Sequence, residues 1–383
     1  MRQGRIVILH VFDDEKFFDS ASDFFDSIPG IENLYYMYMP DNSSFKFIKK
    51  REKIDVITSY QEYISFFSAF FVDGIYFHSL NYKYYKYFKY ISPEKKVIWW
   101  SWGYEIYHPV RLLQPLIKLD LFKPKTRAYI QKRRKSIRNV IRLLYYVLIY
   151  FHDNYIRKKV LARIDYFTPV IPLEYTLLSK KYSMFRAKPF LLGLGPGISQ
   201  KSEFVYHEKA KHILIGNSLS YTNNHLDIFF IISKYKLGNQ KIVVPINYGE
   251  DYNADKEWFK ENSCLEKDST IWLEDFLPRN VYLELFSNIT HAIFGHIRQQ
   301  AMGNIYICLL NGIKLFLYEN SLIYKQLVAW GFKVFTIDSD MSELALKQVL
   351  SPEDALNNYN IMCKRNEGKV AKYEDGLYSI FKQ

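Results

Sequence analysis

The sequence has 383 residues but contains only three cysteines and no long hydrophobic run. Cys264, Cys308 and Cys363 lie far apart without a C-x-x-C pair, which argues against a disulfide framework and a structural zinc site. No stretch reaches the roughly 20 apolar residues of a membrane-spanning helix. Residues 1–12 lack the apolar core of a signal peptide and predict a first β-strand. These absences together indicate a protein of the reducing cytosol.

Nucleotide and metal motifs are also missing. The G-x-x-x-x-G-K-[ST] loop of a Walker site is absent, and the lack of a complete G-x-G-x-x-G argues against a dinucleotide oxidoreductase. No His, Asp and Glu residues have metal-ligand spacing. Asp338 and Asp340 form a D-x-D pair, but they lie late in the chain. We therefore expect no metal site and no cofactor besides the substrates.

What the sequence does contain predicts two α/β lobes. Hydrophobic residues make up 49% of the chain, enough for a large core. Short apolar segments alternate with helical stretches, which is typical of parallel sheets. The expected strands are 5–12, 34–39, 55–57, 74–77, 96–100 and 166–169, then 212–215, 241–245, 270–273, 291–294, 314–318 and 333–337.

These segments predict a Rossmann-like lobe over 1–190, a linker over 191–210 and a second Rossmann-like lobe over 211–365. A C-terminal helix within 366–383 is expected to pack back on the first lobe. Ligands of such proteins bind beyond the carboxyl ends of the strands and in clefts between domains.

Positive charge is concentrated in residues 123–163. The chain has a net charge of +12, and this stretch holds thirteen Lys or Arg side chains against one acid, Asp153. Its apolar centre, 140–151, is too short to span a bilayer but suits a helix that lies in the membrane interface on anionic lipid. The alternative is a helix that packs its apolar face on the domain while its charges face water. A nucleic acid partner is not expected, because the basic residues cluster in one segment and no recognition motif occurs.

The start of the second lobe has the pattern of a phosphate site. Gly216, Asn217 and Ser218 follow an expected strand, and Asn223 and Asn224 begin the next helix as good N-caps. Backbone N–H groups at a helix N-terminus attract phosphate, and Gly216 would let the backbone approach it. A capped turn without a ligand is an equally good interpretation of this spacing.

A second loop of this kind carries Arg298, Gln299 and Gln300 before a helix that opens near Gly303, with Asn304 beside it. An arginine can pair with a diphosphate through two hydrogen bonds, and the Gln amides can bind sugar hydroxyls. The alternative is a solvated loop with one surface arginine.

The first lobe offers an aromatic cluster over residues 99–107. Trp102, Gly103 and Glu105 follow an expected strand, so an indole ring can stack on a sugar and Glu105 can act as a base. His10 and His78 are expected near the same rim, although an isolated histidine is more often a structural residue. We expect Glu105, His78 and Arg298 to be catalytic, and His10, Trp102 and Gly103 to bind the acceptor.

These residues resemble the bacterial TDP-N-acetylfucosamine:lipid II N-acetylfucosaminyltransferases, glycosyltransferase family 56. The segment Arg298-Gln299-Gln300 with Gly303 is the most specific part of the likeness. The other matching pieces, in order, are Phe77-His78, Trp102-Gly103 with Glu105, Gly216-Asn217-Ser218 with Asn223 and His225, and Val243-Val244-Pro245 with Tyr248.

The resemblance implies a GT-B fold and transfer of an N-acetylfucosamine-like deoxyamino sugar, with retention, from a TDP donor. It also implies an undecaprenyl-pyrophosphate-linked saccharide acceptor, and a peripheral site of action on the cytoplasmic face of the bacterial inner membrane. Arg298, Asn217, Ser218 and Gly303 would hold the diphosphate, and Gln299 or Gln300 the donor sugar. The other residues expected to bind the donor are Gly216, Asn223, Asn224, Tyr248 and Asn304.

Two features depart from the family pattern. Segment 123–163 is longer, and Cys308 stands where many retaining GT-B enzymes carry a ribose-binding glutamate. Two alternatives therefore stay open: a capsule or O-antigen glycosyltransferase that uses a UDP- or GDP-sugar, and a non-catalytic binding scaffold.

Overall fold

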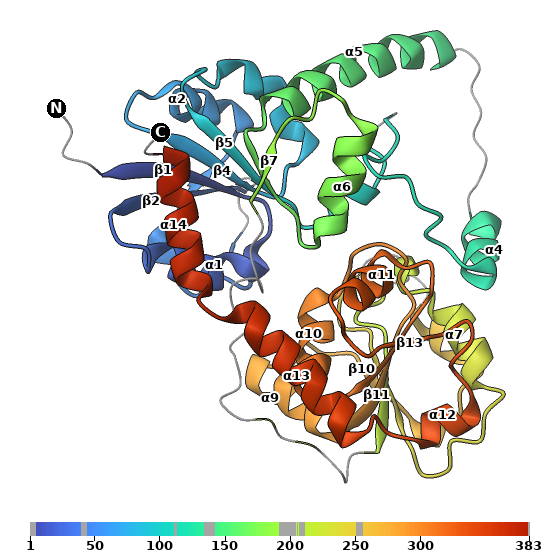
Figure 1. Cartoon of the computed structure of the whole chain (residues 1–383). Helices are drawn as coiled ribbons and strands as arrows, with labels where there is room; N and C mark the ends of the chain where they lie inside the picture. Colours follow the sequence, from blue (N-terminus) through green and yellow to red (C-terminus); the bar gives the residue numbers. More distant parts are fainter. Residues whose placement is uncertain are drawn as a thin grey trace. The chain divides into compact units, whose positions relative to one another are not determined.

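The computed structural model describes residues 5–39, 44–110, 113–133, 142–190, 204, 206, 211–249 and 256–381 (Figure 1). The chain forms two compact units. Unit 1 comprises Met1–Lys118, Arg138–Ile198 and Asn366–Gln383, and unit 2 comprises Leu119–Ile137 and Ser199–Arg365. The linker expected over 191–210 lies outside the described residues, apart from Phe204 and Tyr206.

Unit 1 is built on a sheet of parallel strands in the order β3-β2-β1-β4-β5-β6-β7. Its strands are β1 (Ile6–Phe12), β2 (Ile31–Tyr38), β3 (Ile54–Ile57), β4 (Gly74–His78), β5 (Lys96–Trp100), β6 (Tyr166–Thr168) and β7 (Lys188–Pro189). Its α-helices are α1 (Phe18–Asp26), α2 (Tyr63–Ser68), α3 (Tyr104–Tyr107), α5 (Arg142–Arg163), α6 (Pro172–Lys181) and α14 (Lys369–Phe381). Its 3₁₀ helices are η1 (Glu15–Phe17), η2 (Arg51–Lys53), η3 (Tyr60–Glu62) and η4 (Tyr82–Tyr90).

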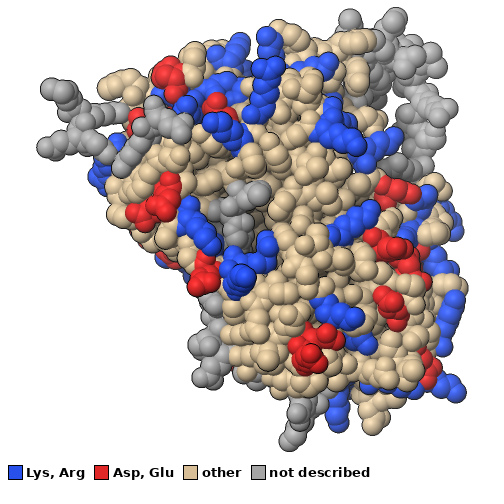
Figure 2. Space-filling model, viewed as in Figure 1, with Lys and Arg blue, Asp and Glu red and all other residues tan. Residues whose placement is uncertain are grey.

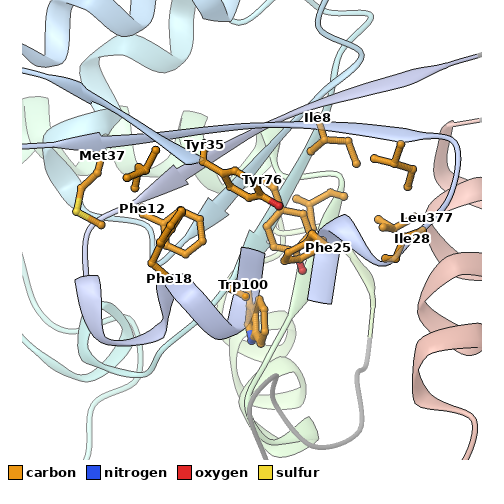
Figure 3. Close-up of a cluster of buried hydrophobic side chains, with 14 of the residues drawn as sticks. Ile8, Phe12, Phe18, Phe25, Ile28, Tyr35, Met37, Tyr76, Trp100 and Leu377 are labelled. Atoms are coloured by element: carbon orange, nitrogen blue, oxygen red, sulfur yellow. The ribbon is translucent and has the colours of Figure 1, made fainter. Parts of the chain in front are cut away.

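The core of unit 1 lies between one face of this sheet and helices α1 and α14 (Figure 3). Every residue of β1 is buried, as its continuous apolar run predicts for a central parallel strand. Phe25 of α1 and Leu377 of α14 are both fully buried. Full burial of a side chain such as Phe25 contributes about 1.5–3 kcal/mol. The C-terminal helix is therefore part of the core of unit 1.

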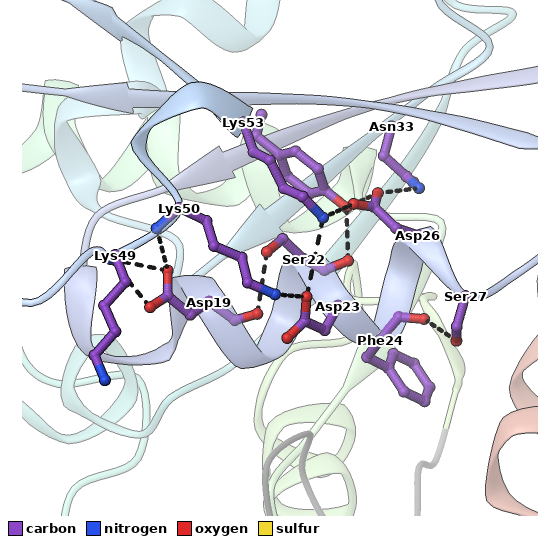
Figure 4. A network of polar contacts seen from close by, with 11 residues as sticks. Asp19, Ser22, Asp23, Phe24, Asp26, Ser27, Asn33, Lys49, Lys50 and Lys53 are labelled. Atoms are coloured by element: carbon purple, nitrogen blue, oxygen red, sulfur yellow. Dashed lines mark hydrogen bonds and ion pairs between the residues drawn. The ribbon is translucent and has the colours of Figure 1, made fainter.

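The other side of α1 is polar. Figure 4 shows a row of carboxylates along the helix that faces the segment before β3. Asp23 pairs with the Lys50 ammonium and Asp26 with that of Lys53, whereas Asp19 accepts from the backbone N–H groups of Lys49 and Lys50. Exposed ion pairs of this kind contribute only about 0–1 kcal/mol each. Their main effect is to fix α1 over the sheet, and Asp26 also bonds to Asn33 of β2.

Unit 2 has a parallel sheet in the order β10-β9-β8-β11-β12-β13. Its strands are β8 (His212–Ile215), β9 (Ile242–Pro245), β10 (Thr270–Leu273), β11 (Ile289–Phe294), β12 (Lys314–Leu317) and β13 (Phe335–Thr336). Its α-helices are α4 (Pro124–Arg133), α7 (His225–Ile232), α8 (Lys256–Glu261), α9 (Arg279–Leu285), α10 (Met302–Leu310), α11 (Leu322–Ala329), α12 (Glu343–Lys347) and α13 (Pro352–Asn366). Its 3₁₀ helices are η5 (Tyr221–Asn223), η7 (Lys267–Ser269) and η8 (Phe286–Asn288). The two parallel α/β sheets confirm the fold class predicted from the sequence.

Helix α4 corrects the expected division of the chain. The sequence analysis placed all of 123–163 with the first lobe, but α4 belongs to unit 2 and packs on α7. The Asp227 carboxylate of α7 accepts hydrogen bonds from Lys125 N (2.8 Å), Thr126 N (3.0 Å) and Thr126 Oγ1 (2.8 Å). The first N–H groups of a helix have no partner within the helix, so Asp227 caps α4 from another element.

Helix α5 contains the rest of the basic segment. Its C-terminal half is held on unit 1 by buried Val160 and Leu161 and by Arg157, whose Nη1 donates to Gln114 O at 2.7 Å. Farther toward its start, Phe151 is 64% and Tyr155 61% exposed. The structure describes the side chains of α5 only from Tyr150 onward. No described helix is both long and apolar enough to cross a bilayer.

Lys and Arg side chains are distributed over both units on the face that Figure 2 shows, with acidic side chains between them. On this face the excess positive charge therefore does not gather into a single continuous track.

Candidate active site

The strand order of unit 2 brings three loops to one edge of its sheet. Strands β9, β8 and β11 are neighbours and all are parallel, so the loops after them lie together at their carboxyl ends. These loops carry the residues expected to bind the donor: Gly216, Asn217 and Ser218, then Tyr248, then Arg298, Gln299 and Gln300. The tertiary structure thus joins residues that are more than 80 positions apart.

A hydrogen-bonded chain links the three loops. Asn217 Nδ2 donates to the Tyr248 hydroxyl at 2.6 Å, and Gln300 Nε2 donates to Asn217 Oδ1 at 3.1 Å. Thr222 Oγ1, which the sequence analysis did not single out, donates to Gln300 Oε1 at 2.6 Å. Asn217 and Gln300 use their amides to hold this edge together, and Tyr248, 38% exposed, is the most accessible member.

Position 216 has to be a glycine because a side chain there would clash with a neighbouring ring. It has a φ of +68°, and a Cβ on it would lie 2.4 Å from His225 Nε2. The expected close approach of backbone at Gly216 is therefore to the ring of His225. That ring is fully buried at the start of α7, and burial lowers its pKa to about 3, so it is neutral.

Asn223 and Asn224 differ most from their expected role. Asn223 Nδ2 donates to Ser218 O (2.9 Å) and Ser218 Oγ (3.1 Å). Asn224 Nδ2 donates to Gly295 O at 2.7 Å, and its Oδ1 accepts from Lys123 N at 2.8 Å. Both side chains are fully buried, and Asn224 makes no capping bond to α7. The two residues fasten loops of the protein to each other, which takes the Asn224 amide and the Asn223 Nδ2 group away from a ligand.

The exposed part of this edge is the start of α10. Its N-cap residue, Ala301, is left-handed (φ +57°) and supplies no capping side chain. A Cβ at Gly303 would meet nothing within 4 Å, so the first turn is open. Unpaired N–H groups and the helix dipole make such a turn attractive to an anion.

Arg298 adds positive charge beside this turn. Its Nη1 donates to Gln299 O at 2.9 Å, and the side chain is partly exposed. His296, two residues earlier, is fully buried; burial and the nearby Arg298 lower its pKa to about 3, so it adds no charge of its own. Asn304 follows in α10 and donates through Nδ2 to the Tyr282 hydroxyl at 2.8 Å.

In unit 1, His10 and His78 form a buried relay. His10 Nε2 lies 2.9 Å from Asn33 Oδ1, and His10 Nδ1 lies 2.9 Å from His78 Nε2. Asn33 donates its amide N–H to Asp26 at 3.2 Å, so its carbonyl oxygen faces His10. The donor and acceptor order then assigns a proton to Nε2 of each ring.

His10 therefore lies in the core and not at the rim where the sequence analysis expected it. It points to the same face of β1 as Ile8 and Phe12, where it is fully buried among aromatic rings. Burial lowers its pKa to about 3. His78 ends β4 and is also buried, at 1% exposed, with its pKa well below the usual value.

Glu105 anchors its own loop. Its Oε1 accepts hydrogen bonds from Trp102 N at 3.0 Å and Trp99 Nε1 at 3.2 Å. Burial raises the pKa of this carboxyl, which is only 7% exposed. Gly103 has a φ of +93°, which a residue with a Cβ adopts only with strain. The loop thus presents Trp102, whose ring lies 4.1 Å from that of Phe17, while Glu105 itself is held inside.

Asp13 lies at this edge, although sequence reasoning marked only the strand end to which it belongs. It directly follows β1, and its Oδ1 accepts from the Tyr84 hydroxyl at 2.7 Å. The signal that points to it is position: it is the first acidic residue after the central strand of the predicted sheet.

Buried polar atoms without a hydrogen-bond partner among the described residues gather at both carboxyl edges. In unit 1 they include Asp13 Oδ2, His78 Nδ1, Ser101 Oγ and Trp102 Nε1, and in unit 2 Asn223 Oδ1, Gln299 Oε1 and both ring nitrogens of His296. Buried polar atoms are nearly always bonded in native proteins. Their concentration at the strand ends marks these two edges as places for polar ligands.

The D-x-D pair has a structural role. Asp340 Oδ2 accepts from Thr336 N (2.7 Å) and Thr336 Oγ1 (2.9 Å), and Asp338 Oδ2 accepts from Glu319 N (2.8 Å). Within the described part of the chain, no three His, Cys, Asp or Glu side chains group as metal ligands. Cys308 is fully buried in α10.

Comparison with known proteins adds a family and a fold. Residues 195–362 match the family model described as 4-alpha-L-fucosyltransferase, glycosyl transferase group 56. This match contains all the expected donor-binding residues of unit 2. No curated protein matches the chain significantly by sequence.

Solved structures match along nearly the whole chain. The lipopolysaccharide outer core galactosyltransferase WaaB, in its apo form, is 12% identical with a TM-score of 0.56, covering 98% of this chain and 99% of WaaB. HepE of Anabaena, in complex with UDP and glucose, is 9% identical with a TM-score of 0.63, covering 99% and 100%. Sucrose-phosphate synthase of Thermosynechococcus elongatus is 9% identical with a TM-score of 0.62, covering 99% of each chain.

At 9–12% sequence identity the solved structures show only that the fold is shared. The family match, in contrast, is a match of amino-acid sequence, and it lies almost entirely in unit 2. Both agree with two parallel α/β sheets whose loops converge at their carboxyl edges. The match and the fold together support a GT-B glycosyltransferase whose residues 195–362 are similar to group 56, in agreement with the resemblance drawn from its sequence.

Proposed function

We propose that this glycosyltransferase moves an N-acetylfucosamine-like deoxyamino sugar from a TDP donor to an undecaprenyl-pyrophosphate-linked saccharide. The observation that carries the donor half is the open first turn of α10 with Arg298 beside it. Cleavage of a nucleotide-sugar leaves negative charge on the diphosphate, and preorganised positive groups stabilise that charge. The TDP nucleotide and the sugar rest on the likeness to group 56.

In this mechanism the residues of unit 2 divide the work. Arg298 and the N–H groups at Met302 and Gly303 hold the leaving diphosphate, and Gln299 recognises the donor sugar. The Tyr248–Asn217–Gln300 chain keeps the loops in place, so that little reorganisation is needed when charge develops. We propose that no metal ion is needed, since these groups supply the positive charge at the diphosphate. That the sugar is transferred with retention is also proposed, from the likeness to group 56.

The acceptor half is assigned to the carboxyl edge of unit 1. Trp102 offers an indole ring that can stack on a saccharide. Exposed Phe151 and Tyr155 on α5, followed by exposed Lys158 and Lys159, suit a membrane interface with anionic lipid. The enzyme would then act peripherally on the cytoplasmic face of the inner membrane, where a lipid-linked acceptor is found.

The test is a thermal-shift screen of the whole chain with TDP, UDP, GDP and CMP, first without metal and then with magnesium. A ligand that binds only the folded state stabilises it by mass action and so raises the melting temperature. At a ligand concentration of 100 times Kd, the free energy of unfolding rises by about 2.7 kcal/mol. Selective stabilisation by TDP without metal supports the proposal. Selective stabilisation by UDP or GDP would instead indicate a UDP- or GDP-sugar donor and the synthesis of a different surface polysaccharide. The UDP bound to HepE makes UDP the second candidate.

A further inference from the structure

Helix α4 comes from a segment of the chain that unit 1 flanks on both sides in the sequence. Unit 2 takes Leu119–Ile137 from between two stretches of unit 1 and adds it to Ser199–Arg365. Because the neighbours of this segment in the sequence belong to unit 1, its attachment to unit 2 depends on noncovalent contacts. These contacts are made with α7 and with residues 220–224 before it, which include η5 and form the η5 turn.

The η5 turn also contacts the loop after β11, residues 295–301, which we call the donor loop. Asn224 makes both connections with one side chain. On the α4 side, its Nδ2 donates to Leu121 O at 3.0 Å and its Oδ1 accepts from Lys123 N at 2.8 Å. On the other side, the same Nδ2 donates to Gly295 O at 2.7 Å. A single buried amide therefore bonds the start of α4 to the start of the donor loop.

Two other residues of the η5 turn repeat this arrangement. The ring of Tyr221 lies 5.9 Å from that of Tyr129 in α4. Next to it, Thr222 Oγ1 donates to Gln300 Oε1 at 2.6 Å, near the end of the donor loop. The η5 turn is thus held by α4 on one side and by both ends of the donor loop on the other.

The backbone leaves the turn and the donor loop little room to move independently. A Cβ at Gly295 would lie 2.3 Å from Asn223 O, so the two segments are in direct contact. Asn224 has a φ of +51°, a left-handed conformation that the surrounding contacts have to maintain. Departure of α4 would remove both bonds of Asn224 to the α4 segment. We therefore expect the turn, and the donor loop with it, to relax when α4 leaves.

The donor loop is the part of unit 2 on which the proposed diphosphate site depends. It carries Arg298 and Gln299 and ends at left-handed Ala301, which opens α10. Its conformation decides where the guanidinium lies relative to the first N–H groups of α10. A site whose groups are already in position binds its ligand more tightly, because less ordering accompanies binding.

We propose that docking of α4 on unit 2 sets the conformation of the donor loop and thereby the affinity for the nucleoside diphosphate. The inference rests on the proposed function, since it concerns the same diphosphate site. Asp227, which caps α4, and Asn224, which bonds it to Gly295, are positioning residues. Thermodynamic linkage makes the effect reciprocal: a ligand that binds the ordered donor loop stabilises docked α4 by the same factor.

The test compares Asp227→Ala and Tyr129→Ala with Asn358→Ala. The first two release α4 from opposite sides of its contact with unit 2. The control removes a buried amide of α13 that bonds to Lys333 N and O at 2.8 and 3.0 Å, so it destabilises unit 2 without touching α4. Isothermal titration with TDP should give a Kd about tenfold higher in both α4 variants and within about twofold of the wild type in Asn358→Ala.

Steady-state kinetics separates this role from a general loss of structure. The KM for the TDP-sugar should rise in the α4 variants by a factor similar to that for the Kd. At saturating donor, kcat should stay within about twofold, because the bound donor itself restores the ordered loop. An equal fall of kcat and kcat/KM in the α4 variants would overturn the proposal.

Hydrogen exchange measures the coupling directly. In the wild type, saturating TDP should slow the exchange of the Lys125 and Thr126 amides by a factor similar to the change in Kd. Without nucleotide, the α4 variants should exchange the amides of 295–300 about tenfold faster than the wild type, while those of 314–317 in β12 keep their rates.

The outcomes distinguish the two levels of the argument. Wild-type affinity for TDP in a variant whose α4 amides exchange freely would overturn the proposal, as would an equal loss of affinity in Asn358→Ala. If the wild type binds none of TDP, UDP, GDP and CMP, the proposed function fails. The exchange of 295–300 in the nucleotide-free protein then decides whether α4 controls the donor loop, and unchanged rates there would overturn the inference as well.

Discussion

The attachment of α4 to unit 2 depends on one carboxylate, so Asp227→Ala should release this helix. Pro124 is the first residue of α4 and has no N–H, and the next two N–H groups, of Lys125 and Thr126, both donate to Asp227. Asp227 is 7% exposed and Thr126 is fully buried, so water cannot simply replace the lost acceptor.

The magnitude follows from these three bonds. A hydrogen bond to a charged group contributes about 1.5–3 kcal/mol, and loss of a helix cap costs about 0.5–2 kcal/mol. Such terms are not additive within one network. We expect Asp227→Ala to lower the free energy of unfolding of unit 2 by about 2–4 kcal/mol, and Asp227→Asn, which keeps one acceptor oxygen, by about half as much.

Two assays check this. Urea unfolding gives the change in free energy, and amide hydrogen exchange reports whether Lys125 and Thr126 lose protection before the strands of unit 2. Asp268→Ala is the matched control, because Asp268 is an exposed aspartate of the same unit; it should change stability by less than about 0.5 kcal/mol. A change of that small size for Asp227→Ala, with α4 amides exchanging as in the wild type, would refute the capping argument.

Three further predictions concern the site and its surroundings. Arg298→Ala should lower kcat in steady-state kinetics by about 10²–10³-fold with the fold intact, because one donor to the transition state is lost. The control, Lys347→Ala at an exposed lysine, should leave kcat unchanged, and equal rates for the two variants would contradict the role of Arg298 in donor binding. Gly103→Ala should destabilise the protein by about 1–3 kcal/mol in urea, because φ is +93° there; an unchanged unfolding midpoint would mean that the loop relaxes freely. Replacing Phe151 and Tyr155 together by Ser should reduce flotation with vesicles rich in anionic phospholipid but not change turnover of a soluble acceptor analogue; undiminished flotation would contradict the membrane role of α5.

The two sheets could be predicted because their signals are local. A short apolar run such as 6–12, interrupted only by His10, is typical of a strand buried on both faces, and β1 is buried throughout. The loops after β8 and β11 were found for the same reason, since a strand, a polar loop and a helix start follow one another directly. Their convergence in space then follows from parallel pairing.

The roles of particular side chains could not be predicted in this way. Asn224 is a good helix cap by its residue type, yet its amide bonds to Gly295 and Lys123, which lie about 70 and 100 positions away. His10 was placed at the rim because it lies near a strand end, but strand alternation turns it into the core with Ile8 and Phe12. The spacing of residues along the sequence does not show whether a polar side chain will bond to a near or to a distant partner.

The sequence by itself therefore determined the two parallel α/β sheets and the segment that contains Arg298, because hydrophobic periodicity and loop composition act over a few neighbouring residues, while the GT-B class came from the resemblance to a known family. Only the tertiary structure decided that α4 belongs to unit 2, that Glu105 and the two asparagines fasten loops, and that Asp13 is a partly exposed carboxylate at the carboxyl edge of unit 1. The physical reason is that burial and hydrogen-bond partnership depend on groups far away in the chain, and these two quantities set both the pKa of a side chain and its freedom to meet a ligand.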